Sequence, residues 1–222
     1  MLGHFIFLFA VVPFVWASDI HGVIRMAPPY PSAKKIQVQE KYRNACSNEQ
    51  VSQSLIVSGN GLIKNAVIFL DGNFKSENVV ERNALILDQK NCNFQPHILI
   101  VKEGSNFLIA NSDPMAHDVR AFDRDKMVFR FEMDPFGKPV AKRIEGSGTY
   151  VIRCGLHPWM YAFVVNAKHP FYAVSGEGGE FELHGVPNGI YKLRIWHETL
   201  GEAEVPIEVK GPIEDFSYVF KN

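Results

Sequence analysis

Short runs of alternating apolar and polar residues recur along this chain of 222 residues. A period of two is typical of strands with one buried and one exposed face. Gly, Pro, Asn and Asp separate the runs, as in antiparallel sheets. Residues 41–54 could form a helix or a loop. The pattern predicts an all-β fold with strands near 36–38, 54–57, 66–70, 98–101, 106–110, 150–153, 161–165, 179–183, 189–196 and 205–209.

Composition sets the size of the cores and excludes one class of partner. With 46% hydrophobic residues, the chain can build one large or two small domains. Segments near 71–80 and 168–170 suggest domain boundaries. The block 84–167 between them has the size of a small β-sandwich. Because the net charge is −1 and Lys and Arg are dispersed, we expect no nucleic-acid partner.

The N-terminus predicts export. Residues 5–16 are almost wholly apolar and end at Ala17, but the run is shorter than the roughly 20 residues of a membrane span. We therefore predict a signal peptide at 1–17, no stable membrane span after its cleavage, and a periplasmic or otherwise exported protein. An uncleaved anchor is the alternative, because no Lys or Arg precedes the run. Cys46 and Cys92 could form a disulfide in that compartment or remain two buried thiols.

Four residues form a candidate metal site. Cys154, His157 and Met160 lie in one short stretch, and His117 lies upstream. One Cys, two His and a weakly bound Met are the ligands of a type 1, or blue, copper site. The thiolate and the imidazoles form a trigonal plane, and the thioether is the long axial ligand. The residues therefore predict one bound copper ion.

Other interpretations of these residues remain open. Cys154 alone could be a buried thiol, and His157 alone could be a turn residue on the surface. Zinc is the other metal to consider, although a Met ligand argues against it. Met115 competes with Met160 as the axial ligand. A second metal site is weakly indicated by scattered histidines, His169, His184 and His197.

The loop from Cys154 to Met160 resembles that of the cupredoxins, with the Cys-x-x-His-x-x-Met spacing of amicyanin. Residues 94–104 and 111–119 resemble the preceding strand pair and the loop that carries the first His. The resemblance implies a Greek-key β-sandwich with copper bound by His117, Cys154, His157 and Met160. Asp118 departs from the pattern, because many cupredoxins have there an Asn that ties the two ligand loops together.

The flanking residues resemble a second family. Residues 65–72 and 175–193 are similar to strands of carboxypeptidase regulatory-like domains, which have a transthyretin-type β-sandwich. We therefore expect residues 18–80 and 168–222 to form the two parts of this second sandwich, with the cupredoxin domain, 84–167, inserted between them. Three consecutive modules are the alternative.

These observations favour an exported one-electron carrier with a redox protein as partner. Pro158 and Trp159 are expected to form an apolar patch around an exposed edge of His157. A copper enzyme is disfavoured, because Arg153 and Gly155, and no His, flank Cys154. The second function to consider is a carbohydrate- or protein-binding sandwich in which copper is structural or secondary.

Overall fold

A computed structural model describes residues 17–72, 74 and 85–221. Apart from Ala17, the predicted signal peptide lies outside these residues, so its cleavage stays a prediction. Among the described residues no helix is long and apolar enough to cross a membrane. The predicted all-β class is confirmed, since strands dominate and the α-helix, α1 (Arg43–Cys46), has a single turn.

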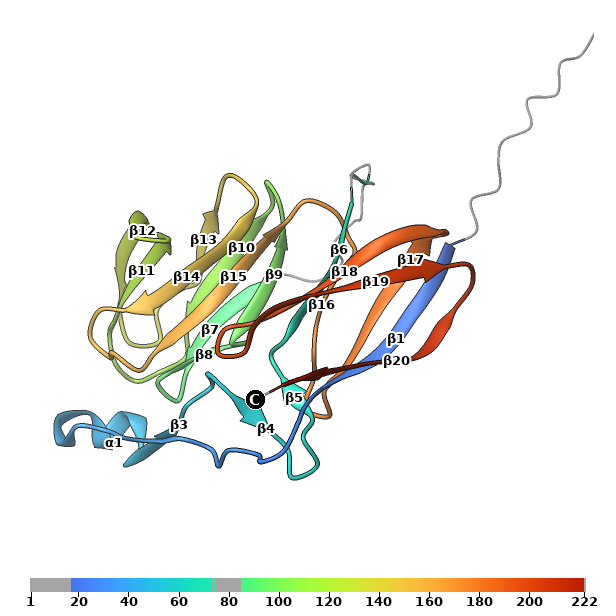
Figure 1. Ribbon diagram of the computed structural model, residues 1–222. Helices are drawn as coiled ribbons and strands as arrows, with labels where there is room; N and C mark the ends of the chain where they lie inside the picture. Colours follow the sequence, from blue (N-terminus) through green and yellow to red (C-terminus); the bar gives the residue numbers. More distant parts are fainter. Residues whose placement is uncertain (1–16, 73, 75–84, 222) are drawn as a thin grey trace, which may run out of the picture.

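Two β-sandwiches lie next to each other (Figure 1). The first sandwich pairs a five-stranded sheet, in the order β12-β11-β14-β15-β9, with a four-stranded sheet, in the order β13-β10-β7-β8. Its strands are consecutive in the sequence: β7 (Ile86–Lys90), β8 (Asn93–Gln95), β9 (Ile98–Lys102), β10 (Asn106–Asn111), β11 (His117–Asp123), β12 (Lys126–Met133), β13 (Val140–Arg143), β14 (Gly148–Cys154) and β15 (Tyr161–Ala167).

Strands from both ends of the chain build the second sandwich. One sheet has the order β17-β1-β20 and the other β16-β6-β18-β19, so the first sandwich lies between β6 and β16 in the sequence. A hairpin of β4 (Ile56–Val57) and β5 (Ile63–Lys64) lies beside them. The strands are β1 (Ala17–Met26), β6 (Val67–Asp71), β16 (Tyr172–Val174), β17 (Glu180–Pro187), β18 (Gly189–His197), β19 (Gly201–Val209) and β20 (Ile213–Phe220).

Each sandwich has its own core, because its strands bury alternate residues. Phe94, Phe107 and Ile152 belong to the core of the first sandwich, and Ile24 and Leu183 to that of the second. The first core also contains Cys154 and Met160, so both ends of the loop between them are anchored in that core. Such packing limits the movement of the loop.

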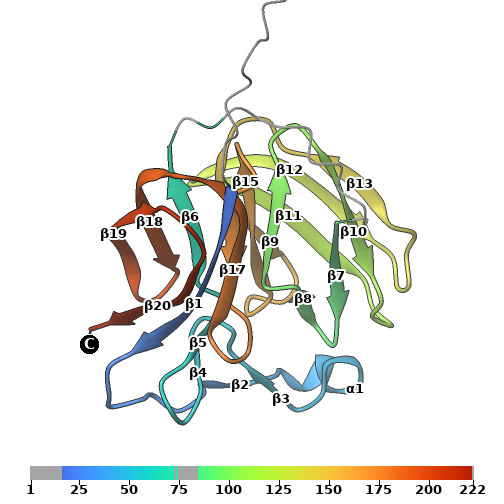
Figure 2. The same ribbon diagram turned by 90° about the vertical axis from the view of Figure 1, so that its right-hand side faces the viewer.

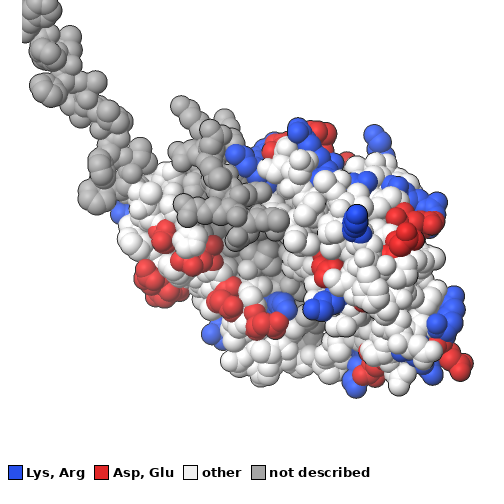
Figure 3. All heavy atoms as spheres, turned by 180° about the vertical axis from the view of Figure 1, so that it is seen from behind, with Lys and Arg blue, Asp and Glu red and all other residues white. Residues whose placement is uncertain are grey.

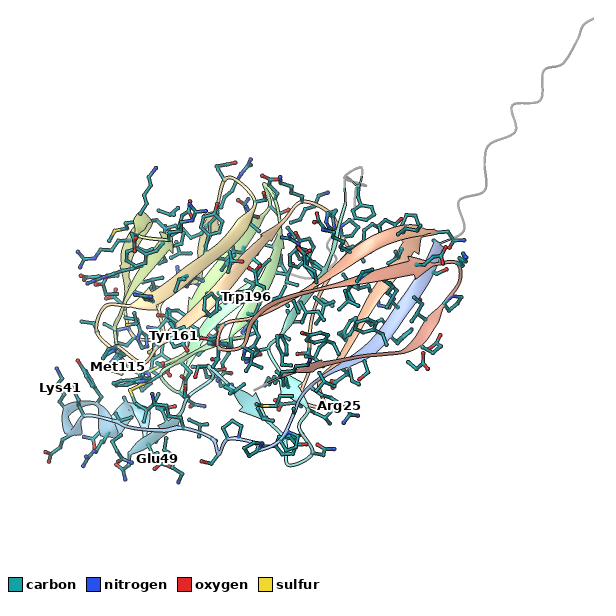
Figure 4. All side chains as sticks on the ribbon, in the orientation of Figure 1. Arg25, Lys41, Glu49, Met115, Tyr161 and Trp196 are labelled. Carbon is teal, nitrogen blue, oxygen red and sulfur yellow. A yellow bond between two sulfur atoms is a disulfide. The ribbon has the colours of Figure 1, made fainter. Side chains whose placement is uncertain are left out.

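A third apolar cluster joins the two sandwiches. Phe163 and Trp196 meet edge to face, with ring centroids 5.1 Å apart. Beside them, the partly buried carboxylate of Glu198 contacts His97 and accepts a hydrogen bond from the Tyr161 hydroxyl at 2.8 Å. Figure 4 shows Tyr161 and Trp196 on the side of each sandwich that faces the other. The sandwiches therefore share a partly apolar, hydrogen-bonded interface.

Residues 35–51, here called the cover segment, cross one end of the first sandwich (Figure 2). The segment contains β2 (Lys35–Gln37), the 3-10 turn η1 (Glu40–Tyr42), α1 and β3 (Glu49–Val51). A disulfide between Cys46 and Cys92 ties it to the β7–β8 turn. From the sequence, Cys46 and Cys92 could form a disulfide or remain two thiols, and residues 41–54 could form a helix or a loop. The structure has the disulfide, and it has short turns and the strand β3 in that range.

Charged groups are dispersed over the described surface. On the face in Figure 3, small groups of acidic and basic side chains lie between areas of uncharged surface, and neither sign forms one continuous field over the described residues. This dispersion is consistent with the net charge of −1, and the absence of a nucleic-acid partner stays a prediction.

Ile152 should carry much of the stability of the first sandwich. It is fully buried on β14, two residues before Cys154, and truncation to Ala should lower the free energy of unfolding by about 2–5 kcal/mol, since it leaves a cavity. Denaturant unfolding measures this. Ile190→Ala is the matched control, because Ile190 is 79% exposed and its truncation should change stability by about 0.5 kcal/mol or less. Equal effects of the two substitutions would contradict the assigned core.

Candidate metal centre

Strand pairing brings the first two candidate ligands together. His117 begins β11 and Cys154 ends β14, and these strands are antiparallel neighbours in which Val119 is opposite Cys154. The turn after β14 then places His157 beside both. Two backbone hydrogen bonds close this turn: Cys154 donates to the Met160 carbonyl at 3.0 Å, and Met160 donates to the His157 carbonyl at 2.9 Å.

The donor atoms of three predicted ligands converge. Cys154 Sγ lies 3.6 Å from Nδ1 of His117 and 3.5 Å from Nδ1 of His157, and the two Nδ1 atoms are 3.1 Å apart. Metal–ligand bonds of about 2.0–2.3 Å separate neighbouring donors by about 3–4 Å, so this triangle matches the spacing around one ion. Nδ1 of His157 faces this triangle, while its Nε2 is turned away, buried and without a hydrogen-bond partner among the described residues. The side chains therefore fit a metal that prefers sulfur and imidazole ligands.

Cys154 is poised to be a thiolate. Its burial opposes ionisation, but contacts with the imidazoles of His117 and His157, together with the backbone N–H groups of Leu156 and Asp118, lower its pKa to about 5. The thiolate is the form that binds metals. Burial lowers the pKa of His117, but contacts with Asp113 and Cys154 outweigh it and raise that pKa.

Asp113 fixes the orientation of His117. Its carboxylate is 2% exposed and lies 3.0 Å from Nε2 of His117. The same oxygen accepts the backbone N–H of Cys92 at 2.9 Å, so it is held from both sides. An imidazole that donates Nε2–H to a carboxylate carries its lone pair on Nδ1, which here is the atom facing Cys154.

A backbone hydrogen bond ties the two ligand loops together. The N–H of Gly155 donates to the carbonyl of Asp118 at 2.8 Å. The buried Asp118 carboxylate turns away to the guanidinium groups of Arg120 and Arg130, which outweigh its burial and lower its pKa. A Cβ at position 155 would collide with the ends of the Arg120 and Asp118 side chains, so glycine leaves room for this ion pair. The chain therefore keeps a tether although it lacks the expected Asn.

The two candidate axial ligands have different surroundings. Met160 is buried in the core that contains Cys154. The thioether of Met115 lies against the disulfide, 3.4 Å from Sγ of Cys46 and 3.6 Å from Sγ of Cys92. Figure 4 places Met115 at the end of the first sandwich, close to the cover segment. This packing favours Met160, whose role as ligand stays a prediction.

The other histidines do not join this centre in the described structure. His97 is buried against Glu198, and Nδ1 of His197 accepts a backbone hydrogen bond from Thr199. His169 packs among aromatic rings. His184 lies on the surface of the second sandwich, where its imidazole and the carboxylates of Asp19 and Glu182 form another group of metal-binding type. The weakly indicated site combining His169, His184 and His197 is therefore not formed.

His157 is not exposed, and the expectation of a free edge surrounded by an apolar patch is wrong. Its side chain is 0% exposed, because the ring of Tyr42 covers it edge to face at a centroid distance of 4.4 Å. Trp159 packs on it from another direction, at 5.3 Å. Sequence patterns missed Tyr42, which is far from the loop in the chain, and Asp113, since no spacing rule links it to His117.

Comparisons with known proteins are weak. No protein-family model matches this chain, and no curated protein matches it. A reduced amicyanin variant aligns with a TM-score of 0.35 and 20% identity, covering 45% of this chain and 98% of amicyanin. A purple cupredoxin from Nitrosopumilus maritimus aligns with a TM-score of 0.32 and 22% identity, covering 37% of this chain and 96% of the cupredoxin.

A copper-containing nitrite reductase from Thermus scotoductus has a TM-score of 0.34 and 19% identity to this chain. The alignment covers 40% of this chain and 23% of the reductase, so the chain spans less than a quarter of that enzyme. At these scores, the assignment of the metal centre depends on the geometry of its own side chains.

In the metal-free protein, Cys154 should ionise at unusually low pH. The thiolate fraction should rise as the pH passes about 5, whereas an unperturbed thiol ionises near pH 8.5. Ultraviolet absorbance of the thiolate measures this titration. Cys154→Ser should abolish the transition, because the other two cysteines are bridged. A thiol that titrates above pH 8 would contradict the predicted stabilisation by His117 and His157.

Asp113→Asn should weaken metal binding while leaving the fold in place. Loss of the negative charge beside His117 should lower the affinity for Cu²⁺ by about 10–100-fold, as is usual for groups that orient a metal-binding His. Competition with a chelator measures the affinity. Asp123→Asn is the control, because Asp123 ends the same strand and is exposed. An unchanged affinity in Asp113→Asn would show that the contact with His117 has no effect on binding.

Proposed function

We propose that this protein is an exported, type 1 copper protein that carries one electron at a time. The observation that carries the proposal is the triangle formed by Cys154 Sγ and the Nδ1 atoms of His117 and His157, with sides of 3.1–3.6 Å. Both imidazoles are fully buried and the pKa of the thiol is about 5. The three donors are thus positioned, and the thiol is ionised at neutral pH.

The set of donors favours copper over zinc. A thiolate, two imidazoles and a buried thioether, that of Met160, suit copper, while zinc sites rarely include Met. Bound copper would supply one-electron oxidation and reduction. The protein's own part is to hold His117 and Cys154 on paired strands and to exclude water, so that the ligands move little between oxidation states.

Electron transfer is favoured over catalysis by what surrounds the centre. Arg153 and Gly155 flank Cys154, so the ligand loop contains no adjacent His to connect a second metal. Among the described residues, the other group of metal-binding type is Asp19, Glu182 and His184. That group lies on the second sandwich and is largely exposed, so it does not extend the centre.

The organisation of the chain supports a carrier domain displayed on a scaffold. We propose that residues 84–167 form the electron-carrying unit and that 18–80 and 168–222 form a regulatory-like sandwich around its insertion point, because β1 and β6 pair with strands from the C-terminal part. A disulfide fits an oxidising, exported location. The proposed partner is a redox protein.

One observation favours the alternative of a binding module in which copper is secondary. A hollow of about 660 Å³ lies on the second sandwich, between β1, β17 and the segment that begins β20. Four carboxylates line it together with His21 and Arg25. Phe181 and Phe216 add apolar surface to these charged groups, and a hollow of this size can hold a carbohydrate or part of a protein.

Addition of copper should produce an intense visible absorption band. The band arises from charge transfer between the Cys154 sulfur and copper, so Cys154→Ser should abolish it and His157→Ala should shift or weaken it. Visible absorption spectroscopy with a metal assay makes the measurement. A folded wild-type protein that stays colourless with stoichiometric copper would overturn the proposed function.

His184→Ala is the matched control for His157→Ala. It removes an imidazole from the surface group, where any bound copper has oxygen and nitrogen ligands without sulfur. The variant should keep the full visible band. It could lose weakly bound copper in the metal assay, which separates surface binding from occupation of the buried centre.

A further inference from the structure

The cover segment closes the side of the metal centre that its turn loop would otherwise present to solvent. The Tyr42 ring lies against His157, and its hydroxyl donates to the Leu156 carbonyl at 3.1 Å. Trp159 contacts both rings, with its centroid 5.3 Å from His157 and 6.0 Å from Tyr42. An ion or a reagent that approaches along this side therefore meets Tyr42 first.

The cover segment pairs with no strand of either sandwich in the described structure, although Val38 and Cys46 are buried in the core of the first. Among the described strands, β2 and β3 pair with each other and with no other strand, and α1 has four residues. Few polar contacts hold the segment to the first sandwich besides the Tyr42 hydroxyl. Gln50 donates to the Asn91 carbonyl at 3.1 Å and accepts from the side chain of Asn93. Such a segment is expected to open at a lower free energy than the sheets beneath it.

The disulfide attaches the cover segment covalently to the first sandwich. Its second cysteine, Cys92, contacts residues that surround the metal centre. The backbone N–H of Cys92 donates to Asp113, which orients His117. The Cys92 carbonyl accepts the indole N–H of Trp159 at 3.1 Å. Cys46, by contrast, ends helix α1 in the cover segment. The bond therefore joins the fixed part of the site to the part that covers it.

We propose that the cover segment is a lid locked by the Cys46–Cys92 disulfide, and that the redox state of this bond decides whether the centre retains or exchanges its metal ion. As far as the ion is copper, this inference rests on the proposed function. With the bond intact, Tyr42 stays on His157 and the centre is suited to repeated electron transfer. With the bond broken, the lid opens and the centre can take up or release its ion.

A dithiol reductant would supply the chemistry of opening. One of its thiolates attacks a sulfur of the bridge, which breaks the bond and forms a mixed disulfide with Cys46 or Cys92. Its second thiol displaces that residue. The products are two protein thiols and one cyclic disulfide of the reductant, so two electrons enter the protein. An oxidising environment restores the bond by the reverse exchange with an oxidised dithiol.

The test uses the full-length protein without metal and measures the rate at which iodoacetamide alkylates Cys154. A variant with both Cys46→Ala and Cys92→Ala lacks the lock and keeps one thiol. Alkylation should be about tenfold faster or more than in the oxidised wild type at the same pH, because the lid opens more often. Mass spectrometry of the modified peptide identifies the site. Equal rates would overturn the proposal.

Substitutions in the lid keep the test decisive if the double variant does not fold. Tyr42→Ala, with the disulfide intact, should also speed alkylation, whereas Tyr42→Phe keeps the ring and should have a smaller effect. Asn44→Ala is the matched control, because Asn44 is an exposed neighbour on α1, and it should behave as the wild type. A Tyr42→Ala rate equal to that of Asn44→Ala would contradict the lid.

Release of bound copper to a chelator provides the second measurement. Dithiol treatment should accelerate release from the wild type but not from the double variant, which should already be fast. If the wild type shows no visible band with copper but the double variant is alkylated faster, the copper function is wrong and the cover segment is a lid over a reactive thiol. A normal band with unchanged alkylation and unchanged release would defeat the lid and leave the copper function intact.

Discussion

The candidate metal centre depends above all on the antiparallel pairing of β11 and β14. This pairing places the end of one strand beside the start of the other, so that Cys154 and His117 lie together before any metal binds. The register is fixed because each strand buries alternate side chains in the core, and a slip by one residue would turn them outward. The loop that carries His157 is then short enough to complete the site.

Electrostatics and packing act together around these donors. Burial alone would keep Cys154 protonated, but two imidazoles and two backbone N–H groups reverse this and hold a thiolate. Asp113 controls the imidazole of His117, since its carboxylate contacts Nε2 and so leaves Nδ1 to face the thiolate. The result is a preformed set of donors whose charge and direction suit a metal ion that prefers sulfur and imidazole ligands.

The second sandwich and the cover segment give the centre a setting that a small carrier domain alone would not have. Glu198 and Trp196 fasten the second sandwich to the sheet that bears the site. Tyr42 closes the imidazole side that the loop leaves open. Contact with a redox partner, in the proposed function, would therefore run through aromatic side chains of the cover segment and the loop, not through His157 directly.

The sequence by itself determined the all-β class, because strand periodicity and turn residues are local properties of the chain. It also singled out Cys154, His157 and Met160, whose spacing within one loop is a local property too. His117 could be proposed from the character of its loop. Tyr42, Asp113 and the choice between a disulfide and two thiols were decided only by tertiary structure, since they depend on how segments far apart in the chain pack. The burial of His157 follows from that packing.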